Sequence, residues 1–497
     1  MSAPPGIGSF PGGLNPDDLP RSPGLPPHSI PPLPPRLIFP LLQSRGIELI
    51  PQVENNQAVF KGQILADHPD HPPIHASSSG IIETVTDWPL PYPSAVSGRC
   101  LVIHTDGLDA SDNKPCTQPL SASPQHLFDR LWQAGVVGLG GAGFPTADKL
   151  RGAALHTLIL NAAECEPLAS ADLTLLTHSP HRVLAGASFL CRSLGFKRCL
   201  LALEADKIDL AHSLQKTLGL REFDTIELTR IPVRYPTGSE RQLIQVLTGK
   251  EVPLHGRPQD LGIVCLNVAT VAAIHDAVLL NRPLTERWIT LTGQGLQTPH
   301  NLWARIGTPV ADLVQHCGGY RPGASRLVMG GAMMGYPLLT DQVPIIKSSY
   351  CIWVAGVNES TDLEREHACI RCGACVEVCP AGLMPQELYR NVKSSDWAQT
   401  TSLNLDACIA CGCCNAVCPS HIPLVQHFMA AKKVTAHKIK AQALAHQAKA
   451  RYEARLARKA REEQERAENA RRRKENLEKN RAGEIQGALA RLKAKRV

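Results

Sequence analysis

The sequence predicts a multidomain protein that combines α/β and α+β folds. Short β-like runs broken by Pro, Gly and Ser fill residues 36–107, helix and strand patterns alternate over residues 120–285, and one cysteine motif occurs twice between residues 369 and 419. The chain has 497 residues, enough for three or four domains of ordinary size. We therefore expect several domains, each with its own core.

The N-terminal part divides into an arm and a β domain. Residues 1–35 contain twelve prolines and almost no apolar periodicity, so we expect a Pro-rich disordered arm. In residues 36–107, "KGQILAD" followed by "IHASSSGIIETV" resembles the barrel-sandwich fold of biotinyl and lipoyl carrier domains. Carrier domains need a modifiable lysine at a hairpin tip, and no lysine lies between Leu65 and Ser79. We therefore interpret this domain as a structural or docking unit.

A glycine-rich segment, "VVGLGGAGFPTADKL", matches the dinucleotide fingerprint G-x-G-x-x-G at Gly138, Gly140 and Gly143. In that fingerprint a strand leads into the first glycine, and an acidic residue follows about 20 positions later. Glu164 supplies the acid, but the apolar spacing of "SPQHLFDRLWQAGVV" predicts a helix before the loop. We therefore reject a Rossmann turn. The glycine amides still suit a phosphate or a flat ring, with Lys149 as a nearby cation; the alternative is a plain tight turn.

The segments after this loop predict an α/β domain over residues 120–285. "PTADKLRGAA" predicts a helix, "HTLILNAAE" a buried strand, and "RCLLALEA" and "TIELTRIPV" two further strands between helices. Over residues 286–350, short strands flank one amphipathic helix, which indicates a small β-grasp module.

Two cysteine runs, "CIRCGACVEVCP" and "CIACGCCNAVCP", start 39 residues apart and share the pattern C-x2-C-x2-C-x3-C-P. This is the spacing of bacterial ferredoxins and predicts two [4Fe-4S] clusters in a domain over residues 360–430; zinc sites usually pair C-x2-C elements across longer separations. The fourth cysteine of each run ligates the other cluster in such repeats, so we predict crossed ligation. The predicted sets are Cys369, Cys372, Cys375 with Cys418, and Cys408, Cys411, Cys414 with Cys379.

One further cysteine, Cys413, stands outside the repeat, where the first copy has Ala374. We interpret it as a packed free thiol.

The formal net charge of +7 belongs to the C-terminal tail, because residues 431–497 hold 21 Lys and Arg against 8 Asp and Glu. No Gly or Pro lies between Pro423 and Gly483, which predicts a long polar helix or a helix-prone disordered tail. Interleaved Glu indicates a solvated helix that anionic lipid or an acidic partner would attract, and we expect no nucleic-acid binding. Without a secretory signal or about 20 consecutive apolar residues, we expect a cytoplasmic chain that does not span a membrane.

The loop "GLGGAGFPTADK" is similar to the flavin-binding glycine loop of the NADH-oxidising flavoprotein of respiratory complex I. Three segments with further similarity follow in the same order: "NAAECEP", "YPTGSERQL" and "LNVATVAAI". In that family such segments surround FMN and leave a shelf over its ring for NADH. The resemblance thus implies a Rossmann-like α/β domain that binds FMN and NADH.

The resemblance also implies roles for individual residues. Lys149 would contact the flavin phosphate, Glu164 and Glu166 would be the catalytic carboxylates, and Phe144 and Glu166 would contact NADH. The family has an aromatic residue shortly after the lysine and often an arginine second in the loop, whereas this chain has Leu150-Arg151-Gly152 and Leu139. The remaining implied contacts to the cofactors are the glycines Gly138, Gly140, Gly141 and Gly143, and the pocket residues Asn161, Tyr235, Gly238, Asn267 and Thr270.

The domain order resembles the RnfC (RsxC) family, a component of the Rnf (Rsx) ion-translocating electron-transport complex, over about residues 30–430. That order is a barrel-sandwich domain, a flavin domain, a β-grasp module of the SLBB type, a two-cluster ferredoxin-like domain and a tail. The resemblance implies a peripheral subunit on the cytoplasmic side of the bacterial inner membrane. It would exchange electrons between NAD(H) and iron–sulfur carriers through FMN and two [4Fe-4S] clusters, coupled by the complex to ion translocation. The alternative is a non-catalytic electron-relay or docking subunit without a working NADH site.

The implied partners are the integral subunits of that complex, a ferredoxin-like subunit, NADH and a ferredoxin-type electron donor. Flavin is expected because nicotinamide transfers two electrons as a hydride, whereas each cluster transfers one.

Overall fold

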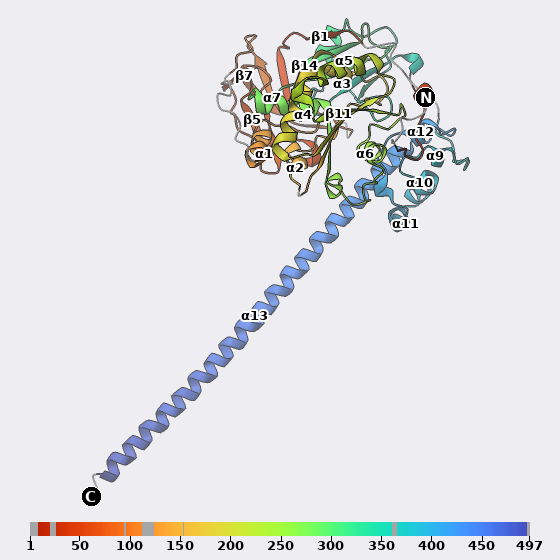
Figure 1. Ribbon diagram of the computed structural model, residues 1–497. Coiled ribbons are helices and arrows are strands. Elements are labelled where there is room, and N and C mark those ends of the chain that lie inside the picture. The colour runs from red at the N-terminus through yellow and green to blue at the C-terminus, as the bar shows by residue number, and fades with distance from the viewer. Residues whose placement is uncertain are drawn as a thin grey trace. The chain divides into compact units, whose positions relative to one another are not determined.

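The computed structural model of the protein describes residues 8–19, 26–93, 96–111, 124–152, 154–359 and 365–494 (Figure 1). The chain forms two units, Met1–Phe428 and Met429–Val497. Parts of three predicted regions lie outside the described residues. They are residues 1–7 and 20–25 of the arm, residues 360–364 of the cluster domain and residues 495–497 of the tail.

The first domain is the predicted all-β domain, built from two small sheets. Leu37, Leu65, Ile82 and Leu101 are fully buried in its core. One sheet has the order β2-β8-β7-β4 and the other the order β3-β5-β6, with antiparallel neighbours throughout. The strands are β2 (Arg36–Pro40), β3 (Ile50–Pro51), β4 (Ala58–Val59), β5 (Ile64–His68), β6 (His71–His75), β7 (Gly80–Pro89) and β8 (Ser97–Thr105).

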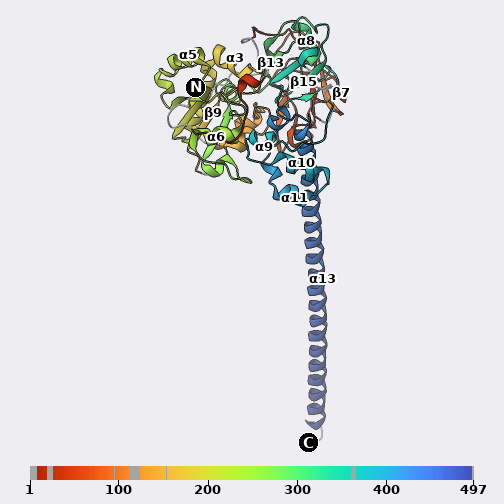
Figure 2. The same ribbon diagram turned by 90° about the vertical axis from the view of Figure 1, so that its right-hand side faces the viewer.

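The second domain is α/β, with a parallel sheet in the order β11-β10-β9-β12. Because side chains alternate along a strand, Ile159 and Leu200 pack with α6, whereas Leu158 and Leu201 pack with α4 and α7 on the other face (Figure 2). The strands are β9 (Thr157–Asn161), β10 (Arg198–Glu204), β11 (Ile226–Ile231) and β12 (Ile263–Asn267). The helices are α3 (Ala171–His178), α4 (Pro180–Leu194), α5 (Ile208–Leu218), α6 (Glu240–Thr248) and α7 (Val268–Leu279).

The glycine loop lies between two helices, α1 (Pro124–Gln133) and α2 (Thr146–Leu150). Leu127 and Leu131 are the buried face of α1. The predicted helix before the loop is confirmed, and with it the rejection of a Rossmann turn, which needs a strand at this point.

The third domain is a six-stranded mixed sheet in the order β1-β14-β13-β17-β15-β16 with one helix, as a β-grasp module requires. The sheet continues to Ala355, beyond the predicted boundary at residue 350, and takes its edge strand from the N-terminal arm. Its elements are β1 (His28–Ser29), β13 (Glu286–Thr292), β14 (His300–Arg305), α8 (Val310–His316), β15 (Arg326–Met329), β16 (Tyr336–Pro337) and β17 (Cys351–Ala355).

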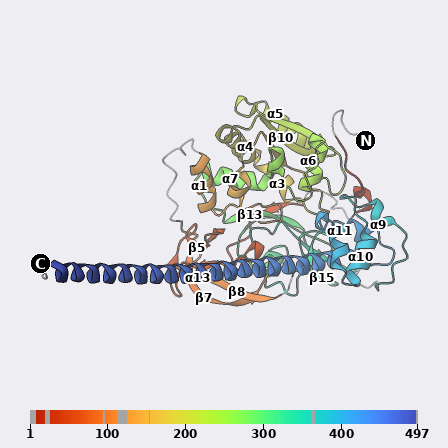
Figure 3. The same cartoon turned by 90° about the horizontal axis from the view of Figure 1, so that it is seen from below.

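The cysteine-rich domain contains short helices beside α6 of the α/β domain (Figure 3). These are α9 (Ala374–Glu377), α10 (Pro385–Lys393), α11 (Trp397–Ser402) and α12 (Cys413–Ala416). Single 3-10 turns complete the described elements at Pro16–Asp18, Ser44–Gly46, Arg221–Phe223, Pro258–Leu261, Val357–Glu359 and Leu405–Ala407.

The prediction of a disordered arm is wrong for residues 8–19 and 26–35. Phe10 and Leu14 are buried, at 5% and 7% exposure, and strand β1 pairs in parallel with β14. An extended segment that buries isolated side chains needs neither helical nor strand periodicity, so its composition resembles that of a disordered chain. Composition therefore failed to detect an ordered segment.

The expectation that every domain has its own core is also wrong for the first two domains. One apolar cluster contains Ile74 and Ala76 of the β domain together with Leu131 and Ala134 at α1. The β domain is thus packed directly against the helix that leads into the glycine loop.

The C-terminal helix α13 (Leu424–Ala494) includes almost the whole second unit. Its side chains beyond residue 436 are almost all exposed, and ion pairs four residues apart, such as Lys449 with Glu453 and Arg458 with Glu462, stabilise it. This confirms the predicted long polar helix. Among the described residues, no helix is both long enough and apolar enough to cross a bilayer.

Candidate functional site

The glycine loop is closed by its own backbone and exposes its tip. The amide of Gly138 donates to the carbonyl of Phe144 over 2.7 Å, and the amide of Gly143 donates to the carbonyl of Gly138 over 3.2 Å. Gly140 and Gly141 are exposed, and Gly141 has a φ of 105°, which a side chain would strain. A ligand can therefore approach the main chain at the tip.

Three domains hold this loop in place. The hydroxyl of Thr270 on α7 accepts a 2.9 Å hydrogen bond from the amide of Leu139, and the Arg287 guanidinium donates over 3.0 Å to the Leu139 carbonyl. The hydroxyl of Ser44, in the β domain, donates to the Gly143 carbonyl over 2.9 Å. The loop is thus preorganised by contacts from outside its own segment.

Two asparagines end the central strands next to the loop. Asn161 and Asn267 are paired in register at the carboxyl ends of β9 and β12, where the strand order reverses. Asn161 donates through Nδ2 to the Gly238 carbonyl over 2.8 Å, and Asn267 caps α7 by accepting from the Ala269 amide over 2.9 Å. This edge of an open parallel sheet is where such folds bind ligands.

The loop and the sheet edge adjoin each other. A Cβ built on Gly140 would lie 3.4 Å from Cβ of Asn267. Lys149, on α2, forms an ion pair with Glu240, the first residue of α6 and two positions after Gly238. A cation, two side-chain amides and the start of α7 therefore surround one region of exposed glycine backbone.

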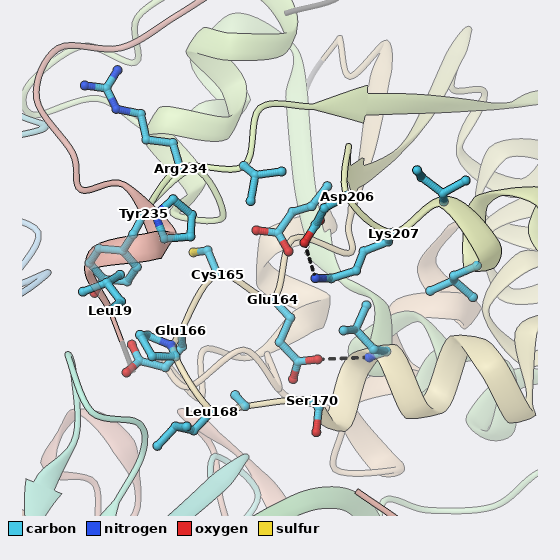
Figure 4. A pocket seen from close by; sticks show the side chains of 18 of the residues that line it. Leu19, Glu164, Cys165, Glu166, Leu168, Ser170, Asp206, Lys207, Arg234 and Tyr235 are labelled. Carbon is cyan, nitrogen blue, oxygen red and sulfur yellow. Dashed lines mark hydrogen bonds and ion pairs between the residues drawn. The ribbon is translucent and has the colours of Figure 1, made fainter. Parts of the chain in front are cut away.

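A cavity of about 500 Å³ lies at the carboxyl ends of β9, β10 and β11 (Figure 4). Glu164 lines it and accepts hydrogen bonds from the amides of Asp172 and Leu173 over 3.1 and 3.0 Å, at the start of α3. Burial raises the pKa of Glu164 to about 8, and the neighbouring Asp172 carboxylate raises it further. Glu164 therefore positions α3, and Asp172 in turn accepts a hydrogen bond from Asn267.

Glu166 lies on the same cavity but faces the third domain. Its Oε1 accepts a 2.7 Å hydrogen bond from the Met333 amide, and a side chain on Gly331 would overlap its carboxylate at 2.1 Å. Its Oε2 is buried without a hydrogen-bond partner among the described residues, and burial raises the pKa of Glu166 to about 7. Glu166 is therefore the acid with capacity left for a ligand.

Tyr235 connects the α/β domain to the cysteine-rich domain. Its side chain is 1% exposed, its hydroxyl donates to the Cys411 carbonyl, and its backbone pairs with Leu14. The predicted site residues thus fall into two groups. Around the loop and sheet edge lie Gly138, Gly140, Gly141, Gly143, Phe144, Lys149, Asn161, Gly238, Asn267 and Thr270; around the cavity lie Glu164, Glu166 and Tyr235.

The eight cysteines of the two motifs form the two crossed sets. Cys369, Cys372, Cys375 and Cys418 line one small cavity. In the second set, burial raises the pKa of the Cys414 thiol, and the neighbouring thiols of Cys411, Cys408 and Cys379 raise it further. The structure therefore brings the fourth cysteine of each run to the other run.

The two runs share one backbone conformation. The φ angles of Arg371 and Gly373 are 57° and 85°, and those of Ala410 and Gly412 are 55° and 83°. In the second run this conformation directs the Ala410 amide to the Cys408 sulfur over 3.4 Å. Amides directed at sulfur stabilise thiolates and tune the potential of the cluster they hold.

The spacing of the thiols fits clusters better than single ions. Among the described residues, no three His, Cys, Asp or Glu side chains come close enough to hold one metal ion. A four-iron cube is wider than a single ion, so its thiolates stand farther apart than those of a tetrahedral zinc site. Two sets of four thiols around separate centres therefore fit two [4Fe-4S] clusters.

The two cysteine sets differ in burial. Cys369 and Cys372 are exposed, whereas Cys411 and Cys414 are only 7% and 8% exposed. The buried set lies toward the α/β domain, where Gln242 on α6 donates to the Pro380 carbonyl over 3.1 Å. Cys413 is fully buried and its thiol contacts that of Cys411, as expected for a packed thiol.

The residues around the glycine loop also fit FMN. Exposed glycine amides admit a phosphate or a ring edge, Lys149 supplies a positive charge, and Asn161 and Asn267 supply amide groups at the sheet edge.

Sequence reasoning missed four residues of this region. Ser44 and Arg287 hold the loop, Tyr350 would lie 3.6 Å from a Cβ on Gly141, and Glu240 pairs with Lys149. Glu240 belongs to the quoted segment "YPTGSERQL", so its acidic side chain after Gly238 was a usable signal. The other three come from different domains, and no local pattern indicates them.

Models of four protein families match the chain. They are the RnfC barrel sandwich hybrid domain over residues 8–108, the Nuo51 FMN-binding domain over 131–276, the SLBB domain over 288–337 and the 4Fe-4S dicluster domain over 368–422. The predicted fold classes are thereby confirmed, and so are FMN and iron–sulfur clusters as the cofactors of these domain families.

Similar curated proteins are named as the RnfC-type component of an ion-translocating oxidoreductase complex. The Pseudomonas aeruginosa protein is 43% identical over 90% of this chain and 58% of its own length, and the Erwinia tasmaniensis protein is 40% identical over 98% and 61%. The Yersinia pestis protein is 41% identical over 91% of this chain and 74% of its own length. The chain thus spans about three fifths of the first two relatives.

One solved structure that partly matches the chain is an NAD+-reducing [NiFe]-hydrogenase in the H2-reduced state. It is 22% identical, with a TM-score of 0.44, and the match covers 63% of each chain.

Proposed function

Because the chain belongs to the RnfC family of ion-translocating oxidoreductase complexes, we propose that it exchanges electrons between NAD(H) and iron–sulfur carriers. FMN would be held at the glycine loop and the β9–β12 edge, and two [4Fe-4S] clusters by the crossed cysteine sets. The complex would couple this exchange to ion translocation.

One observation carries the proposal. The α/β domain and the buried cysteine set belong to one compact unit and contact each other through two side chains, Tyr235 to the Cys411 carbonyl and Gln242 to the Pro380 carbonyl. A flavin domain and a dicluster domain held in direct contact support electron exchange between their cofactors.

When bound, FMN supplies a group that takes two electrons together from a nicotinamide and passes them on one at a time. The chain's own residues would bind and orient. Lys149 would neutralise the phosphate, Asn161 and Asn267 would hold the ring system, and Glu166 would offer its unpartnered Oε2 to the nicotinamide side. Glu164 would act as a positioning residue through α3 and Asp172.

The wider setting is part of the same proposal. The chain would be a peripheral subunit on the cytoplasmic side of the bacterial inner membrane, in contact with the integral subunits and a ferredoxin-like subunit. A ferredoxin-type protein would exchange electrons at the exposed set, since Cys369 and Cys372 are accessible from solvent.

The test is anaerobic addition of NADH to the purified chain loaded with FMN and both clusters. We expect the iron–sulfur absorbance to bleach within the mixing time of a manual assay. A chain that retains full FMN and iron but does not bleach, while dithionite bleaches it, contradicts the proposal.

That contrary outcome would favour the second candidate function, an electron-relay or docking subunit. Two departures from the complex I flavoprotein motif favour it, Leu139 in place of arginine and Leu150-Arg151-Gly152 in place of an aromatic residue. Retained FMN separates the two candidates, because loss of FMN would leave the NADH result uninformative about the site.

A further inference from the structure

Residues 8–19, here called the N-terminal clamp, run from α6 across the α/β domain to the cysteine-rich domain. The Gly8 amide donates to the Val246 carbonyl over 2.8 Å, and Phe10 is buried against apolar residues of α6 and the central sheet. The Arg234 guanidinium lies over the Phe10 ring, 5.2 Å from its centre. One end of the clamp is therefore anchored on the α/β domain.

The middle of the clamp contacts the run that ends in Cys379. The Gly13 amide donates to the carbonyl of Val378 over 2.9 Å. Gly12 has a φ of 63°, and a Cβ on it would lie 2.5 Å from the carbonyl carbon of Val378 and 2.6 Å from that of Cys379. Only a glycine lets the clamp approach the Cys379 backbone this closely.

The clamp also reaches the second run of the same cysteine set. Leu14 and Tyr235 exchange two backbone hydrogen bonds of 2.8 and 3.0 Å, and the Tyr235 hydroxyl donates to the Cys411 carbonyl. Leu14 packs in one apolar cluster with Cys411 and Cys413. The clamp thus touches both cysteine runs that contribute to the buried set.

We propose that the N-terminal clamp, through Gly12 and Leu14, positions Cys379 and Cys411 and keeps water from the buried cysteine set. This deepens the proposed function and rests on it, because it concerns how one of the two clusters is held. Gly12 and Leu14 are positioning residues, since they touch the backbone and side chains of ligands and not the cluster itself.

Burial of a cluster affects its reduction potential. Reduction adds a negative charge to a centre that already carries four thiolates, and water stabilises that charge. Opening the clamp should therefore shift the potential of the buried cluster to a more positive value, whereas the cluster of the exposed set should keep its potential.

The test compares Gly12→Ala with Gly107→Ala in the full chain with both clusters. Gly107 also has a positive φ, 78°, but a Cβ there meets nothing within 4 Å, so the two changes share the backbone cost and differ in the contact. Redox titration followed by electron paramagnetic resonance gives one potential per cluster. Cys408→Ala assigns the signal of the buried set by removing it.

We expect Gly12→Ala to shift only the buried cluster's potential, to more positive values, and to increase several-fold the rate at which oxygen bleaches that cluster. Phe10→Ala, which removes the anchor without adding a clash, should act in the same direction, and Phe10→Leu should restore most of the effect. Equal shifts of both clusters, or no difference between Gly12→Ala and Gly107→Ala, overturn the proposal.

These titrations use dithionite and need no NADH. A wild-type chain that fails to bleach with NADH therefore contradicts the proposed function and leaves the clamp test readable.

Discussion

Asn161 and Asn267 stand opposite each other in register, at the ends of two parallel strands that the chain reaches more than 100 residues apart. Asn161 connects to the Gly238 carbonyl, and Asn267 lies beside Gly140 of the exposed loop. This pair brings the four segments that resemble the complex I flavoprotein into one site.

FMN retention should depend on Asn161. Asn161→Ala removes the hydrogen bonds to the Gly238 carbonyl and the Ala163 amide, so the sheet edge loses its order next to the loop. We expect the dissociation constant for FMN to rise about tenfold, the effect of one hydrogen bond worth about 1.4 kcal/mol. Flavin fluorescence released on dilution measures it. Gln215→Ala, on the exposed side of α5, should leave FMN affinity unchanged; a similar loss in both variants contradicts the assignment.

Crossed ligation predicts the iron content of two double variants. Cys369→Ala with Cys379→Ala should remove both clusters, because these cysteines belong to different sets. Cys369→Ala with Cys418→Ala should remove one cluster, because both line the same small cavity.

Iron and sulfide analysis of the purified chains checks this. Ligation within each run would reverse the two results. Cys413→Ala should retain both clusters, and loss of iron in that variant would show that its thiol is a ligand after all.

Glu204 should make stability fall as pH rises. Burial raises its pKa to about 7 from the ordinary 4.5, partly offset by Lys207. Between about pH 4.5 and 7 the folded chain keeps a proton that the unfolded chain has lost, so stability decreases through this window and stays lower above it. Glu204→Gln removes the cost, which is on the order of 2–3 kcal/mol at pH 8.

Thermal unfolding of wild type and variant at pH 5.5 and pH 8 tests this. The gain in melting temperature from Glu204→Gln should be larger at pH 8. The exposed Glu54→Gln should give the same small effect at both pH values, and a gain from Glu204→Gln that does not depend on pH would refute the burial argument.

Lys347 should matter more at high pH. Its side chain is 5% exposed and donates to the carbonyls of Pro73 and Gly135 over 2.7 Å each, and burial lowers its pKa to about 7. Between about pH 7 and 10.5 the unfolded chain binds the extra proton, so wild-type stability rises with pH in this window. Lys347→Met abolishes that gain and leaves two buried carbonyls without a donor, a loss of about 2 kcal/mol.

The melting temperature of Lys347→Met relative to wild type should therefore be lower at pH 9 than at pH 6.5. Lys250→Met, at an exposed position, serves as the matched control and should show no such trend. A penalty that shrinks at pH 9 would mean that the ammonium stays charged when buried.

Local patterns were sufficient for much of the fold. The helix before the glycine loop follows from the spacing of Leu127 and Leu131, and β9 follows from an uninterrupted apolar run that ends at Asn161. Where no periodicity exists, prediction failed, as it did for Phe10 and Leu14 in the Pro-rich segment. The site was only partly predictable, because the glycines and asparagines lie in recognisable segments but Ser44, Arg287 and Tyr350 reach the loop from other domains.

The letters alone establish the cysteine spacing, because three ligands of each cluster lie within seven residues and their geometry is a property of one short loop. Tertiary structure decides which surface each cluster faces. Cys379 and Cys411 are buried because Gly12 and Leu14, more than 350 positions earlier, pack against them, and Tyr235 bridges the two domains. Contacts at such separations arise from the packing of whole domains, so no local pattern records them.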